Sequence, residues 1–127
     1  MFDTFGLPED AEIVGAAIIG VTHSHWGSYD NGDAIALVSL SAIDGLNTFG
    51  NVGQVLMADA IPIGECISGE SVRFSLNTAG INNIAIGGTS LFAFTLESDR
   101  IREEPPMPEA RAYGRTFVNT RLVIDYI

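Results

Sequence analysis

The chain alternates apolar and polar side chains in three stretches, with the periodicity of half-buried β-strands. These stretches are 71–76 (SVRFSL), 89–99 (TSLFAFTLESD) and 121–127 (RLVIDYI). In the first of them, Val72, Phe74 and Leu76 fall on one face. In the last, every second residue from Leu122 onward is apolar. We therefore expect three strands with one buried face each, and a closing strand that is tied into a sheet.

Two further stretches are apolar with little alternation, as expected for strands buried on both faces. They are 12–24 (EIVGAAIIGVTHS) and 34–43 (AIALVSLSAI). A helix over 12–24 would carry Gly15 and Gly20 in its interior, each costing about 1 kcal/mol relative to alanine, so we predict a strand. The two strands are candidates for a hairpin across the long connection at 25–33, which contains the turn signal Asp-Asn-Gly.

The remaining segments indicate loops and one short helix. Residues 3–8 (DTFGLP) have the character of an entry loop. A helical turn is expected over 78–86 (TAGINNIAI), with Asn77 or Thr78 as N-cap and Gly87-Gly88 as its end. Residues 54–68 fit either a short strand or one helical turn, and Pro62 would stop both.

Long polar segments lie between these elements, and the longest is the proline-rich stretch 100–116. A loop of this length inside a compact domain is usually functional or mobile. The whole pattern, about six or seven strands with one short helical turn, predicts an all-β antiparallel sandwich of the jelly-roll kind. We expect residues 1–127 to form a single domain.

Composition limits the classes of partner expected for this chain. The chain has 127 residues, 46% of them hydrophobic, and no apolar run approaches the length of a transmembrane helix. The opening residues have neither the basic region nor the apolar region of a signal peptide. Sixteen acidic residues face six arginines and no lysine, for a net charge of −10. This charge repels phosphates, so nucleic acid and anionic membranes are not expected partners.

Three polar groups are candidates for metal or thiol chemistry. His23 and His25 would share a strand face, but a zinc site usually takes three or four ligands, so a polar patch at a loop edge is favoured. Asp30 and Asp33 could hold calcium in a loop, although the residue at position twelve from Asp30 is a serine and excludes an EF-hand. A plain turn is favoured there. Cys66, the only cysteine, lies in an apolar segment and is expected to be a buried hydrophobe rather than a nucleophile.

Two groups of side chains are candidates for carbohydrate chemistry. Trp26 and Tyr29 flank a loop tip and could stack on the apolar face of a sugar, although a tryptophan that plugs the end of the core fits equally well. Paired acids suited to glycoside hydrolysis occur only in an acidic, proline-rich stretch, where ion pairs with neighbouring arginines are the favoured interpretation. These acids are Glu97, Asp99, Glu103 and Glu104. No catalytic site is predicted, and we do not expect an enzyme.

Three segments together resemble a known family. They are "GLPEDAEIVGAAI" near the start, "SVRFSLNTAGINNIAIGGTSLFAFTLESDRIREEPP" in the second half, and the closing "TRLVIDYI". In their order of strand, turn and acidic loop they resemble DNRLRE-type jelly-roll domains, over about two thirds of the chain. The resemblance implies a β-sandwich of the kind found in phage virion and tail proteins and in large secreted surface proteins. The shared positions are core and turn positions, so the resemblance transfers no functional residue.

One departure from this family bears on partners. Its members usually carry an opening strand or hairpin before the "LP" position, whereas only six residues precede Leu7 here. Either the sequence is a segment of a longer chain, or the sheet lacks an edge strand. A bare sheet edge invites pairing with another chain. We therefore expect a neighbouring subunit, either a second copy or another virion protein, to cover the edge near the N-terminus.

These observations favour a non-enzymatic structural or attachment domain of a phage virion, as a capsid decoration or tail protein. The alternative is a carbohydrate-binding module of a secreted or cell-surface protein, using Trp26 and Tyr29. Both interpretations imply a virion or extracellular location. Calcium at Asp30 and Asp33 is the only candidate cofactor.

Overall fold

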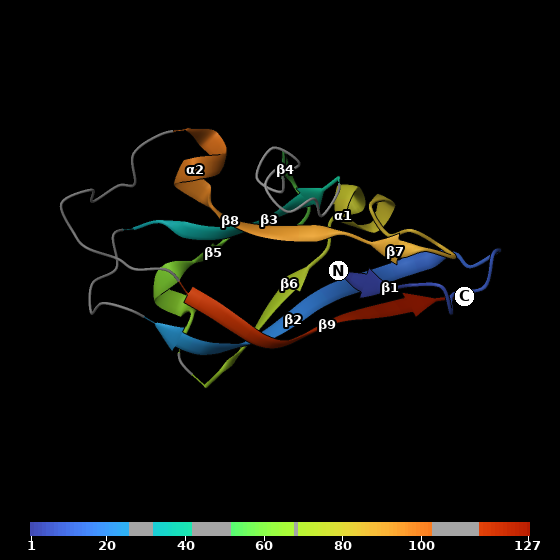
Figure 1. Cartoon of the computed structure of the whole chain (residues 1–127), viewed down its shortest axis with the longest axis horizontal. Helices are drawn as coiled ribbons and strands as arrows, with labels where there is room; N and C mark the ends of the chain where they lie inside the picture. The colour runs from blue at the N-terminus through green and yellow to red at the C-terminus, as the bar shows by residue number, and fades with distance from the viewer. Residues whose placement is uncertain (26–31, 42–51, 68, 103–114) are drawn as a thin grey trace.

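The chain folds into two antiparallel β-layers, as a computed structural model of residues 1–25, 32–41, 52–67, 69–102 and 115–127 shows (Figure 1). One layer contains the sheet β6-β2-β9, and the other contains β3 with its neighbours β4, β5 and β8. The short strands β1 and β7 form a separate pair. The all-β antiparallel sandwich predicted from the sequence is confirmed.

The elements follow one another in the chain in this order: β1 (Phe2–Asp3), β2 (Ile13–His25), β3 (Ala34–Leu40), β4 (Val52–Leu56), β5 (Ile61–Pro62), the 3-10 turn η2 (Ile63–Glu65), β6 (Ser71–Ser75), α1 (Thr78–Asn82), β7 (Thr89–Ser90), β8 (Phe92–Leu96), α2 (Glu97–Ile101) and β9 (Arg115–Tyr126). The structure contains more strands than the six or seven expected. The additional strands are mainly β1, β5 and β7, which are only two residues long each.

Strand β2 is the centre of its sheet. It pairs with β6 along one edge, from Ala17 opposite Ser75 to Val21 opposite Ser71. It pairs with β9 along the other edge over nearly its whole length, with three register shifts. Both edges of β2 are thus occupied by strands that come much later in the chain.

Strand β3 is the centre of the second sheet. Ile35 pairs with both Ile61 and Leu96, so β5 and β8 must lie on opposite edges of β3. Val38 likewise pairs with β4 and with β8. The expected hairpin between residues 12–24 and 34–43 is therefore wrong, because β2 and β3 are the centres of different sheets. The sequence of a strand that is apolar on both faces does not indicate which strand it pairs with. The connection between β2 and β3 is long enough to cross from one layer to the other.

The core fills the space between the layers, and the alternating residues of 71–76 have the predicted orientation. Val72, Phe74 and Leu76 are buried, and Phe74 is only 1% exposed. Cys66 is also buried, as predicted. The cluster of buried residues is Ala16, Ile18, Ile35, Leu37, Met57, Ala58, Ile63, Cys66, Val72, Phe74, Leu76, Ile84 and Phe92.

The stretch 54–68, left open between strand and helical turn, contains both. Strand β4 ends at Leu56, β5 follows, and η2 begins directly after Pro62. Proline has a fixed φ and no amide hydrogen, so it suits the position where a short strand gives way to a turn.

Helix α1 begins as predicted but ends earlier. Asn77 is its N-cap, and its side-chain oxygen accepts a hydrogen bond from the Gly80 amide at 2.9 Å. The helix ends at Asn82, with Asn83 as C-cap, rather than at Gly87-Gly88. Gly87 has a φ of +73° and belongs to the separate turn that leads into β7.

Helix α2 was not predicted: Glu97–Ile101 is mostly polar and directly follows the alternating residues of β8. It ends at Arg102, which adopts a left-handed conformation with φ 57°. Neither α1 nor α2 is long and apolar enough to cross a membrane, and the same holds for every helix in the part of the chain described here.

Gly80→Ala tests how closely α1 packs on the strands. Alanine in a helix is normally more stable than glycine by about 1 kcal/mol. Here the new methyl group would overlap the carbonyl oxygen of Met57 and approach the Leu76 side chain. We expect Gly80→Ala to lower the free energy of unfolding by about 1–3 kcal/mol, measured by urea denaturation.

Gly88→Ala is the matched control, because its added methyl group would meet only Ala85, at an ordinary 3.5 Å. A stabilising Gly80→Ala substitution would show that α1 does not pack this closely.

Candidate functional site

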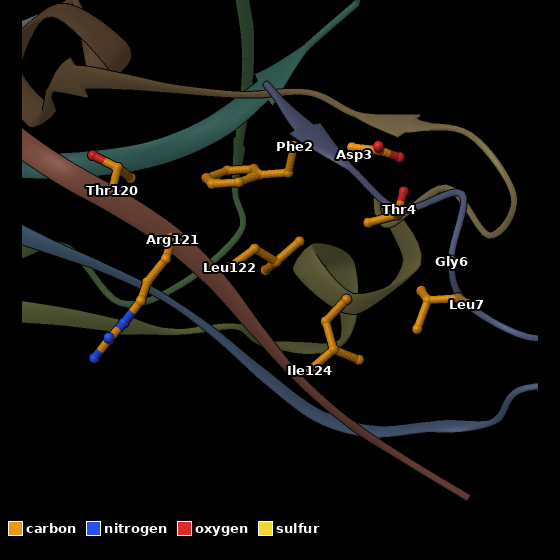
Figure 2. A pocket seen from close by; sticks show the side chains of 9 residues that line it. All are labelled: Phe2, Asp3, Thr4, Gly6, Leu7, Thr120, Arg121, Leu122 and Ile124. Atoms are coloured by element: carbon orange, nitrogen blue, oxygen red, sulfur yellow. The ribbon is translucent and has the colours of Figure 1, made fainter.

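A cleft of about 410 Å³ opens between the N-terminal segment and β9 (Figure 2). Figure 2 shows the apolar side chains of Phe2, Leu7, Leu122 and Ile124 around this space, with Arg121 turned away from it. The full lining is Phe2, Asp3, Thr4, Gly6, Leu7, Thr120, Arg121, Leu122 and Ile124. The walls therefore come from opposite ends of the sequence.

A smaller hollow of about 250 Å³ adjoins the cleft, since both are lined by Phe2 and Thr120. It reaches between the two layers, where Ile18 and Leu37 line it together with Phe92. The cleft is thus the outer part of an apolar space that leads toward the core.

Buried hydrogen bonds hold the N-terminal wall in place. The Thr4 amide donates to the Gly88 carbonyl oxygen at 2.9 Å, and the Gly87 amide donates to the Thr4 carbonyl oxygen at 3.2 Å. The Thr4 hydroxyl lies 2.9 Å from the Ser90 hydroxyl, and both residues are buried. The predicted entry loop is therefore fastened to the turn before β7, and Phe2–Asp3 adds a short strand there.

The other wall is the last part of β9. The amides of Glu12 and Ile127 each donate to the other residue's carbonyl oxygen, at 3.1 and 3.0 Å. Leu122 and Ile124 face the cleft, while Val123 between them is exposed on the outer face of the sheet. The expectation that the terminal strand joins a sheet is confirmed.

Asp33, one of the two candidate calcium ligands, holds β3 and α2 together. Its Oδ1 accepts hydrogen bonds from the Ser98 amide at 3.0 Å and from the Ala34 amide at 2.9 Å. Its Oδ2 accepts one from the Ser98 hydroxyl at 2.5 Å, and Asp33 is only 4% exposed. The carboxylate thus satisfies an amide in the first turn of α2, which explains why a helix begins there.

Asp30, the other candidate calcium ligand, lies outside the described residues, and so do the candidate sugar-stacking residues Trp26 and Tyr29. Calcium binding and sugar stacking by this loop therefore stay predictions. His23 and His25 are two positions apart at the end of β2. Across the described ranges, no group of three or more His, Cys, Asp or Glu side chains could hold a metal ion.

Among the acids considered for glycoside hydrolysis, Glu97 forms the expected ion pair. Its Oε2 accepts a hydrogen bond from Arg100 Nε at 2.8 Å, and Oε1 accepts one from Arg100 Nη2. This hydrogen bond raises the pKa of Arg100 further. Arg100 also donates to the Gln54 carbonyl oxygen at 3.0 Å, linking α2 to β4. Glu103 and Glu104 lie outside the described residues.

The cleft was not predicted from the sequence. The signal available was the presence of two large apolar residues, Phe2 and Leu7, in a segment interpreted as an entry loop. Comparison with protein-family models, with curated proteins and with solved structures found no match to this chain.

Ser98→Ala tests whether the contact with Asp33 stabilises the fold. The substitution removes the hydroxyl donor from a buried carboxylate and leaves the amide donor in place. We expect it to lower the free energy of unfolding by about 1.5–3 kcal/mol, the range for hydrogen bonds to charged groups. The measurement is the urea midpoint at unchanged slope.

Ser71→Ala, on the exposed face of β6, is the control and should change stability by less than about 0.5 kcal/mol. Equal midpoints for the two variants would contradict a stabilising role for Asp33 and Ser98.

Proposed function

We propose that this chain is a non-enzymatic structural or attachment domain of a virion, of the capsid-decoration or tail type. It acts by binding another protein subunit along β9 and the adjoining cleft. The observation that carries the proposal is the combination of a long strand edge and an apolar cleft at one place. An unpaired strand edge offers amides and carbonyls to a further strand.

Exposed apolar side chains support this location. Val123 is 37% exposed and Tyr126 is 46% exposed on β9, and Phe5 is 66% exposed in the segment that forms the opposite wall. Single exposed apolar residues are common, but several of them on the two segments that bound an apolar cleft are typical of an interaction surface.

The hydrogen bonds of the buried polar groups also support a structural role. Asp33, Thr4 and Ser90 are buried, and each hydrogen bonds to a neighbouring segment of the fold. These groups stabilise the scaffold, and the surface is left to make contacts. The resemblance to jelly-roll domains of virion proteins and the net charge of −10 agree with a protein partner rather than nucleic acid.

Density-gradient fractionation tests the proposed location. When particles and free proteins of the producing culture are separated, we expect the chain to sediment with the particles in a fixed ratio to their major protein. Mass spectrometry of the fractions measures that ratio. Recovery of the chain only among free proteins would overturn the virion proposal.

A glycan array tests the role of the loop after β2, with calcium and again with chelator. We expect no specific binding by the wild type under either condition. Binding that is lost in Trp26→Ala and retained in Tyr126→Ala would replace the structural proposal with a carbohydrate-binding module. Tyr126 is the matched control because it pairs with Ile13, at the opposite end of β2 from this loop.

A further inference from the structure

Strand β9 lies at the edge of the sheet that the described residues form. It contains 12 residues and pairs with β2, and no other strand of the described ranges pairs with it. The strand has neither a proline nor a lysine, two residues that commonly block edge pairing. A register shift and the left-handed Asn119, with φ 52°, interrupt it before Thr120. The regular part of the edge is therefore 120–126.

The orientation of the free hydrogen-bonding groups follows from the pairing with β2. Glu12 and Ile127 exchange both backbone hydrogen bonds, so Ile127 directs its amide and carbonyl toward β2. In an antiparallel strand the direction alternates from residue to residue. The amides and carbonyls of Tyr126, Ile124 and Leu122 consequently point to the free edge.

We propose that two copies of this chain pair antiparallel through β9, around a two-fold axis at Val123. In this register Leu122 of one copy exchanges backbone hydrogen bonds with Ile124 of the other, since both point to the free edge. Val123 faces its own counterpart as a non-hydrogen-bonded pair, in which side chains come closest. The two β6-β2-β9 sheets then form one continuous sheet across the dimer.

Charge selects this register. Arg121 and Asp125 are exposed on the outer face, and neither forms an ion pair within the described part of the chain. With the axis at Val123, Arg121 of each copy stands opposite Asp125 of the other, again as a non-hydrogen-bonded pair. An axis at Arg121 or at Asp125 would set like charges opposite each other, which destabilises antiparallel pairs.

The cleft supplies the apolar part of the interface. Leu122 and Ile124 line the cleft, so in the dimer the same residues of the second copy lie beside them on that face of the sheet. Tyr126 of one copy stands opposite Thr120 of the other and gains a neighbour for a side chain that is 46% exposed in the single chain. The second copy therefore extends the apolar lining of the cleft.

The dimer depends on the proposed function in one respect: it names a second copy of this chain as the subunit that binds the β9 edge. Its test is separate from gradient fractionation. A chain that sediments with particles yet fails the experiments below would retain its structural role and lose this mode of pairing.

Charge reversal tests the register by sedimentation velocity of the whole chain. We expect the wild type to sediment as a dimer, and Arg121→Asp or Asp125→Arg to weaken dimerisation about tenfold or more, since each places two like-charge pairs in the interface. The double variant Arg121→Asp/Asp125→Arg restores the opposite charges and should restore the dimer. A dimer that both single variants retain, or a monomeric wild type at high concentration, would overturn the proposal.

Arg73→Asp is the matched control. Arg73 and Arg121 both pair with Ile19, from opposite edges of β2, and Arg73 is likewise exposed. Its reversal makes the same change in net charge on the same sheet, and we expect the dimer to remain.

Cross-linking places the two-fold axis. The only natural cysteine, Cys66, is buried, so Val123→Cys introduces a single accessible thiol. Facing residues of a non-hydrogen-bonded pair lie about 4.5 Å apart at Cα, within the range that a disulfide spans. Under mild oxidation we expect Val123→Cys to form a covalent dimer on a non-reducing gel, and Val55→Cys, on β4 and 61% exposed, to stay monomeric. Equal cross-linking of the two variants would contradict the axis.

Discussion

Contacts among three phenylalanine rings join the two layers, and the position of β9 depends on them. Phe74 of β6 packs against Phe94 of β8 at 5.2 Å and against Phe117 of β9 at 6.1 Å between ring centroids, and Phe94 and Phe117 lie 5.0 Å apart. Gly20 makes room for this cluster, since a side chain there would meet Phe117 Cβ at 3.1 Å. The cluster thereby fixes the distance from β9 to the second layer, and the cleft opens farther along the same strand.

The sequence predicted those parts of the fold that depend on neighbours in the chain. The alternation of Val72, Phe74 and Leu76 locates a half-buried strand, and Asn77 caps α1 through an amide only three residues away. Helix α2 could not be predicted in this way, because the carboxylate that receives its first-turn amide belongs to Asp33, 65 residues earlier. The strands that pair with β2 were not predicted for a similar reason: they come much later in the chain, and the packing of both layers determines the pairing.

The candidate site was harder to predict than the fold. Its walls are Phe2 to Leu7 and Thr120 to Ile124, and neither segment carries a motif that points to the other. The contact that holds the first wall joins Thr4 to Ser90, 86 residues apart. Asp33 was named as a candidate calcium ligand, but its residue type alone could not distinguish a metal ligand from a carboxylate that accepts hydrogen bonds from a helix.

The buried cysteine has a consequence for measuring the motions of this fold. Cys66 is 3% exposed and packs in the core next to η2, with its sulfur 3.9 Å from the Pro62 carbonyl oxygen. A thiol reagent can reach it only when the packing around η2 opens. The rate at which the unaltered chain reacts therefore reports how often this part of the core opens under native conditions. The chain therefore carries its own probe of local unfolding, in the core next to η2.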